Sequence, residues 1–210
     1  MKSSLAVRAL VTAVLLFAAG ASQAGSGLLG LDHYVTYDDS GIWARHYQLL
    51  LINSLLIGET AAAVWEGGDT RFGRTMWKSI DSTLVGGVTS EVMKKVFSRS
   101  RPEQSPDPNL WFQGSGHESF PSGEVTVVSS IITPVMLEYR HDYPSVYALE
   151  LLPIYDAIAR VKVHGHWQSD VIAGYALGSA AGYFMWQRRQ TPFTLTIMPG
   201  SIKVGWSKSF

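Results

Sequence analysis

Apolar residues follow a helical pattern along much of the chain. In residues 41–64 they recur at Ile42, Leu49, Leu50, Ile52 and Leu56, a spacing that places them on one side of a helix. Four further helices are predicted over residues 75–97, 122–139, 144–158 and 168–187. Strands are not expected in this part of the chain. The pattern therefore predicts a mainly α protein with one domain.

Glycine and proline mark the places where these helices are interrupted or begin. Gly86-Gly87 falls inside the second helix, where the pair indicates either close helix packing or a break. Ser122 is a good N-cap for the third helix, and Pro134 is expected to kink it. Pro144 suits the first turn of the fourth helix.

Three segments lack helical spacing. Residues 25–40 are expected to be irregular, and residues 98–121 carry four prolines without periodicity. A loop of that length inside a compact domain is usually functional or disordered. Residues 193–198 and 202–206 alternate in character around Pro199-Gly200, which predicts a short C-terminal β-hairpin.

The N-terminus has the pattern of a secretory signal. Lys2 and Arg8 precede an apolar stretch, and small residues lead to Ala24, so we expect residues 1–24 to be removed and residues 25–210 to form the mature domain. The alternative is an uncleaved membrane anchor. Export predicts a periplasmic location, with which the lack of cysteine is compatible.

The amino-acid composition limits which binding partners are expected. Seventeen Lys and Arg balance 17 Asp and Glu, so no net charge points to nucleic acid. The apolar stretches 49–64, 125–137 and 171–186 are interrupted or short, and we interpret them as buried helices of a soluble or membrane-surface protein. The abundant Trp and Tyr suit either a core or a membrane surface. Oligomeric state is not indicated.

Three short segments carry residues suited to phosphate chemistry. Lys94, Arg101 and Arg160 supply positive charge, and the two guanidinium groups can each form paired bonds to phosphate oxygens. Ser122 and Gly123 begin a helix, whose free N–H groups form an anion site. The sequence thus predicts a phosphate-binding site assembled from distant segments.

A candidate nucleophile accompanies the cations. His166 and Asp170 are four residues apart, so they share a helix face if a helix begins near His166. A carboxylate there can fix the tautomer of the ring and leave its other nitrogen free to attack. Trp111, Phe112 and Trp167 flank the motifs, where they either pack in the core or line the site.

Together these segments resemble the type 2 phosphatidic acid phosphatase and vanadium haloperoxidase superfamily. The resemblance spans residues 94–170 and rests on Lys-x6-Arg-Pro, Pro-Ser-Gly, and Arg-x5-His-x3-Asp. It implies a helical bundle and a phosphatase that needs no metal or other cofactor. It further implies phosphate binding by Lys94, Arg101, Ser122, Gly123 and Arg160, nucleophilic attack by His166, and orientation of that ring by Asp170.

Two positions depart from the family pattern. Ala159 replaces a usual Ser, and Glu124 replaces the His that protonates the leaving oxygen. Either Glu124 is the acid, or His117 or His164 takes that role, or the leaving group needs little help. Nearby phosphate would raise the pKa of Glu124 and the cations would lower it, so the sequence leaves these alternatives open.

The expected function is hydrolysis of a phosphate monoester or pyrophosphate through a phospho-histidine intermediate. The substrate is a lipid phosphate or a small phosphorylated molecule, and association with a membrane surface is compatible with the composition. One alternative is a phosphate- or lipid-binding protein without turnover, motivated by Glu124. Another is a vanadate haloperoxidase, which the absence of the acid histidine and the short chain disfavour.

Overall fold

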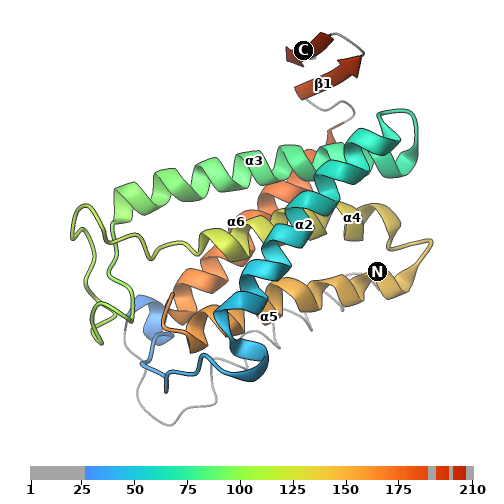
Figure 1. The fold of residues 1–210 in the computed structure, drawn as a ribbon. Coiled ribbons are helices and arrows are strands. Elements are labelled where there is room, and N and C mark those ends of the chain that lie inside the picture. The colour runs from blue at the N-terminus through green and yellow to red at the C-terminus, as the bar shows by residue number, and fades with distance from the viewer. Residues whose placement is uncertain (1–26, 189–192, 199–200, 207–210) are drawn as a thin grey trace.

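The computed structural model describes residues 27–188, 193–198 and 201–206, and the predicted signal peptide lies outside them. Helices make up most of the described chain, as predicted (Figure 1). Its elements are the 3-10 helices η1 (Leu28–Gly30), η2 (Gly41–Trp43) and η3 (Pro144–Glu150), the α-helices α2 (Arg45–Glu66), α3 (Arg71–Phe97), α4 (Gly123–Tyr139), α5 (Leu151–Lys162) and α6 (Gln168–Gln187), and the strands β1 (Phe193–Met198) and β2 (Ser201–Trp206).

The helix boundaries agree with the sequence pattern except in three places. The helix predicted over residues 41–64 is the 3-10 helix η2 followed by α2, which begins only at Arg45. Helix α3 begins four residues before the predicted start because Thr70 caps it, its hydroxyl accepting from the N–H of Gly73 at 2.9 Å. The predicted helix over 144–158 is instead a 3-10 turn followed by α5, which extends to Lys162. Residues 98–121 form no helix or strand.

Small residues allow α4 to pack closely against α6 and α3. A Cβ added at Gly178 of α6 would lie 2.2 Å from the backbone oxygen of Thr126, so only glycine fits there. A Cβ at Gly86 of α3 would lie 2.5 Å from Ser130 Oγ, which identifies Gly86 as a packing glycine rather than a helix break. The N–H of Ser122 also donates to the Asp170 carbonyl at 2.9 Å, which holds the start of α4 beside the start of α6.

The exposed face of α2 corrects one expectation. The sequence predicts that residues 49–64 belong to a buried helix, but Leu50, Ile57 and Val64 are 61%, 69% and 46% exposed at intervals of seven residues. Among the described residues, α2 alone is long and apolar enough to cross a bilayer, and only 17% of its most apolar window is buried. Sequence spacing gave the helix correctly but not which side it buries.

The C-terminal hairpin forms as predicted. Strands β1 and β2 pair antiparallel, with Phe193 opposite Trp206 and Met198 opposite Ser201. It follows α6 at the end of the bundle remote from the loop over 98–121 (Figure 1). The predicted turn residues Pro199 and Gly200 lie outside the described ranges.

Candidate active site

The beginning of α4 forms an anion-binding corner. Ser122 is the N-cap residue but its side chain makes no capping bond, so the N–H groups of the first turn stay available. Lys94 Nζ lies against this turn, since a Cβ added at Gly123 would be 2.8 Å from it. Lys94 also binds Glu91 at 2.6 Å. Glycine at 123 therefore lets a cation approach the helix start.

Arg160 comes to the same region from the last turn of α5. Its guanidinium lies flat against the backbone at Gly165, where an added Cβ would be 2.2 Å from Nη2. The side chain is 6% exposed. Within the described residues, Arg160 Nε and Ser122 Oγ are buried without a hydrogen-bond partner. Buried polar groups are normally paired, so these two are suited to a bound anion.

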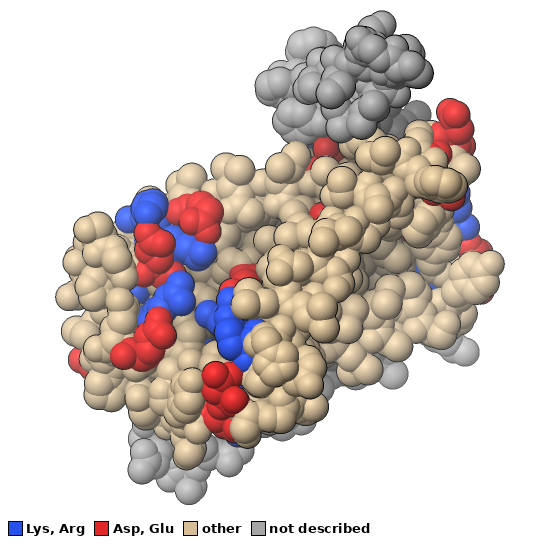
Figure 2. All heavy atoms as spheres, in the orientation of Figure 1, with Lys and Arg blue, Asp and Glu red and all other residues tan. Residues whose placement is uncertain are grey.

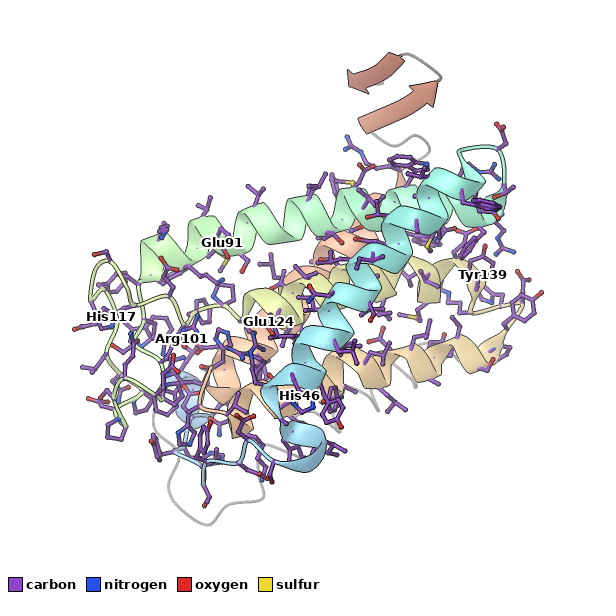
Figure 3. All side chains as sticks on the ribbon, in the orientation of Figure 1. His46, Glu91, Arg101, His117, Glu124 and Tyr139 are labelled. Carbon is purple, nitrogen blue, oxygen red and sulfur yellow. The ribbon has the colours of Figure 1, made fainter. Side chains whose placement is uncertain are left out.

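The remaining predicted cation, Arg101, lies at the same end of the molecule. Its Nη1 is 3.8 Å from Glu103 and its side chain is 27% exposed. Arg101 and Glu124 both lie at the loop end of the bundle, opposite the end that carries Tyr139 (Figure 3). Lys and Arg gather there around a hollowed part of the surface (Figure 2).

His166 is buried and has one defined tautomer. Its Nδ1 lies 2.7 Å from the backbone oxygen of Ser119, which can only accept, so Nδ1 carries the proton. Nε2 forms no hydrogen bond within the described part of the chain and keeps its lone pair. Burial lowers the pKa of His166 to about 4, against the raising effect of Asp170. The ring is therefore neutral over the physiological pH range.

Asp170 stands beside the same ring nitrogen rather than bonded to it. Its Oδ2 is 3.9 Å from His166 Nδ1, and it accepts from the Ser119 hydroxyl and from the N–H of Trp167 at 2.9 Å. Asp170 thus holds Ser119, whose carbonyl orients His166. Burial raises the pKa of Asp170, but the neighbouring donors and cations lower it by more, so it is ionised.

Arg99 links this carboxylate to the N-terminal segment, and sequence reasoning missed it. Its Nη1 donates to Asp170 at 2.5 Å and its Nη2 to Asp32 at 2.7 Å. All three side chains are 0% exposed. Asp32 also accepts from the N–H and hydroxyl of Ser169, each at 2.8 Å. Arg99 lies between two stronger motif signals, Lys94 and Arg101, and nothing in its spacing marks it as buried.

Glu124 is bound by a second arginine outside the predicted set. Arg45 Nη1 and Nη2 donate to its two carboxylate oxygens at 2.6 Å each, and Arg160 Nε is 4.0 Å away. Burial raises the pKa of Glu124, but the hydrogen bonds from Arg45 and the charge of Arg160 lower it by more. The net shift is downward, so Glu124 is a carboxylate.

The two alternative acids occupy other positions. His164 is buried, and its ring nitrogens lie 3.2 Å from the Tyr34 hydroxyl and 2.8 Å from the Val35 carbonyl oxygen. It thereby anchors the segment before α2. His117 lies on the loop over 98–121, with Nδ1 2.9 Å from Ser100 Oγ (Figure 3).

Asp156 is a further buried acid near the site. It lies one helical turn before Arg160 on α5 and is 0% exposed. Neither carboxylate oxygen has a partner among the described residues. Burial, assisted by the charge of Glu124, raises the pKa of Asp156 to about 7, while Arg160 and Arg45 oppose the shift.

The flanking aromatic residues divide between the core and the surface. Trp167 is 1% exposed, and its Nε1 donates to the Ser100 carbonyl at 2.9 Å. Trp111 stacks on Arg99, with 4.3 Å between the guanidinium carbon and the ring centroid. Phe112 is 70% exposed. The two tryptophans therefore support the buried charge network.

Comparison with known proteins finds relatives that are named as phosphatases of a lipid. A lipid A 1-phosphatase of Rhizobium johnstonii is 28% identical over 194 residues, which cover 82% of this chain and 73% of that protein. A lipid A 1-phosphatase of Rhizobium etli is 32% identical over 105 residues, 46% of this chain and 43% of its own. No solved structure gave a significant match.

The family assignment rests on the larger part of the chain. The PAP2 superfamily matches residues 76–193, a range that contains α3 from Met76 onward, the loop over 98–121, α4, α5 and α6. This range includes every cation and the histidine predicted from the three motifs. The chain therefore belongs to the PAP2 superfamily, as its sequence motifs indicated.

Proposed function

We propose that this protein removes phosphate from a lipid phosphate at a membrane surface, through a covalent intermediate on His166 and without a metal ion. Membership of the PAP2 superfamily and the similarity to lipid A 1-phosphatases make it a phosphatase, a phosphoric ester hydrolase. The observation that carries the histidine mechanism is the bond from His166 Nδ1 to the Ser119 carbonyl, because it leaves Nε2 as the free nucleophile.

In the first step, the Nε2 lone pair of His166 attacks phosphorus and the bond to the leaving oxygen breaks. Negative charge on the equatorial oxygens is met by Arg160, Lys94 and the free N–H groups at the start of α4. The ring gains positive character while it keeps its Nδ1 proton. The carboxylate of Asp170, 3.9 Å from that nitrogen, stabilises this charge.

In the second step, water attacks the phosphorus of the phospho-histidine. The bond between phosphorus and Nε2 breaks, the ring regains its lone pair, and inorganic phosphate leaves with the oxygen and both protons of the water. The same cations hold the phosphoryl oxygens in both steps, so the protein does not need to rearrange between them.

Two apolar stripes support a lipid substrate and attachment to a membrane. Val88, Val92 and Val96 of α3 are 64%, 58% and 58% exposed at intervals of four residues. The exposed stripe of α2 contains Leu50 and Ile57, and α2 and α3 contact each other. Exposed apolar residues in such number are typical of a contact with lipid or another protein. The relatives act on lipid A, so we infer a phosphorylated lipid as substrate.

The mechanism is tested by phosphate release from lipid A in mixed micelles. Wild-type protein should release phosphate in the presence of EDTA, and His166→Asn should abolish release. His141→Asn, at an exposed histidine on the turn after α4, is the matched control and should retain activity. Binding of lipid A without turnover by the wild type would instead favour the binding protein that Glu124 motivates.

Attachment and export have separate tests. Ile57→Lys combined with Val92→Lys should abolish flotation with phospholipid vesicles, whereas Leu151→Lys, on exposed α5 surface, should not. We further expect export to the periplasm, with a mature N-terminus at Gly25. Sequencing of the recovered protein from Met1 instead would contradict cleavage.

A further inference from the structure

Arg45 lies outside the motifs and outside the family match, yet it is built into the candidate site. It is the first residue of α2, and its guanidinium binds both oxygens of Glu124 at 2.6 Å. Its Nη1 also donates to Gln48 Oε1 at 3.0 Å, and Arg160 Nη1 reaches the same oxygen at 3.4 Å. The first turn of α2 is thus connected to α4 and α5.

The exposure of the side chains increases from the buried base of the site to its open side. His166 is 3% exposed and Arg160 6%, whereas Glu124 is 22% and Arg45 34%. The leaving oxygen must lie opposite the attacking nitrogen, because phosphoryl transfer proceeds in line. The bulk of a lipid substrate also requires the open side. The leaving oxygen therefore points toward the open side of the site, where Arg45 and Glu124 are more exposed than His166 and Arg160.

This pair is poorly suited to donate a proton. Glu124 accepts two hydrogen bonds from a cation and is flanked by Arg160, an arrangement that stabilises the ionised carboxylate. A guanidinium keeps its protons at all physiological pH values. The pair is neutral overall, but the guanidinium of Arg45 keeps further N–H donors, and Glu124 fixes the direction in which they point.

Given the phosphatase activity proposed above, we propose that Arg45, positioned by Glu124, binds the leaving oxygen, which departs as an anion without a proton from the protein. The bond between phosphorus and oxygen breaks, both electrons remain on the oxygen, and Arg45 offsets part of the new charge. The preferred substrates are then those whose leaving group is stable as an anion, such as a second phosphate group or another acidic hydroxyl.

The alternative is that Asp156 supplies a proton to the leaving oxygen. It is completely buried, its oxygens have no partner among the described residues, and Glu124, Arg160 and Arg45 face it from three helices. A carboxyl in that environment retains a proton that could reach the leaving oxygen through Glu124. The dependence of rate on the leaving group separates the two accounts.

The test measures phosphoenzyme formation in single turnovers with p-nitrophenyl, phenyl and other aryl phosphates. Without a proton donor, the rate should fall by about 10²-fold or more from p-nitrophenyl to phenyl phosphate, since acid catalysis contributes 10²–10⁴-fold. Glu124→His should reduce that fall. A fall below about tenfold in the wild type overturns the proposal, and a steep fall that appears only in Asp156→Asn assigns the proton to Asp156.

Variants of Arg45 test its part directly. Arg45→Met should slow phosphoenzyme formation by about 10²–10³-fold, as expected for one lost donor to a developing oxyanion, and Arg45→Lys should recover part of the rate. Arg74→Met, at an exposed arginine of α3, is the control. An unchanged rate in Arg45→Met refutes the proposal. Phosphoenzyme that still forms in His166→Asn would instead refute the histidine mechanism, whatever the dependence on the leaving group. The measurements with the series of aryl phosphates use the wild-type protein, so they do not depend on whether any variant folds.

Discussion

Replacing Asp32 with Asn removes one of the two carboxylates that neutralise Arg99. Arg99 and both carboxylates are 0% exposed, so water cannot replace the acceptor oxygen that the substitution removes. Asp32 accepts from Arg99 Nη2 at 2.7 Å and from Ser169 twice at 2.8 Å. Asn retains only one acceptor oxygen and turns an amide donor toward these donors.

The expected loss of stability in Asp32→Asn is large for so small a chemical change. Arg99 keeps Asp170 as its counter-ion, so the cost comes from the buried donors of Arg99 and Ser169 that lose an acceptor, about 1–3 kcal/mol each and about 3–5 kcal/mol in total. In a domain of this size, each kcal/mol shifts Tm by about 2–4 °C, so Asp32→Asn should lower Tm by roughly 10 °C. Because the network also holds Ser169 beside Asp170, the variant should lose activity at temperatures where the wild type is stable.

Thermal unfolding followed by circular dichroism in detergent micelles measures this effect. The control is Asp69→Asn, which makes the same chemical change at an exposed turn between α2 and α3. Its Tm should change by less than about 2 °C, as is usual for surface substitutions. If Asp32→Asn behaves like this control, the buried network does not stabilise the fold and the reasoning fails.

Three further predictions follow from individual groups. Burial raises the pKa of Asp156 to about 7, so this carboxyl favours the fold below its ordinary pKa of 3.8 and that contribution is lost as pH rises through about 7. Asp156→Asn should therefore raise the free energy of unfolding more at pH 8 than at pH 4, by up to on the order of 4 kcal/mol, as measured by urea unfolding. The same pH dependence of that free energy in the variant and the wild type would contradict this. Burial lowers the pKa of His166 to about 4, so protonation of this ring should not reduce the rate of phosphoenzyme formation as pH falls through 6.5. A fall in rate near pH 6.5 that persists in Asp156→Asn would count against a buried neutral ring. Gly165→Ala places a Cβ 2.2 Å from Arg160 Nη2 and should lower kcat by about 10²-fold through misplacement of the guanidinium, whereas Gly87→Ala, with nothing within 4 Å, should not.

The sequence predicted most of the helices because their boundaries depend on local signals. Residues 168–187 match α6 at both ends, and the hairpin strands match within one residue. The start of α3 was missed because Thr70, an ordinary polar residue in a turn, acts as the cap. The split of 144–158 into two elements also has no periodic signal.

The motif residues were predictable because their charges are unusual in combination. The structure brings Lys94 and Gly123 together and places Arg160 against Gly165, next to His166. The partners of these residues were not predictable. Arg45 contacts Glu124 across 79 positions of sequence, and such a contact depends on how α2 packs rather than on local pattern. Nor does periodicity show which side of α2 is exposed.

The central claim, attack by His166 on phosphorus, is tested most directly by trapping the intermediate. The protein is mixed with a ³²P-labelled substrate, quenched in base, which preserves phospho-histidine, and digested for peptide mapping. We expect the label on the peptide that contains His166, attached at Nε2, with none in His166→Asn. Turnover without a labelled peptide, or a label on any other residue, would contradict the account.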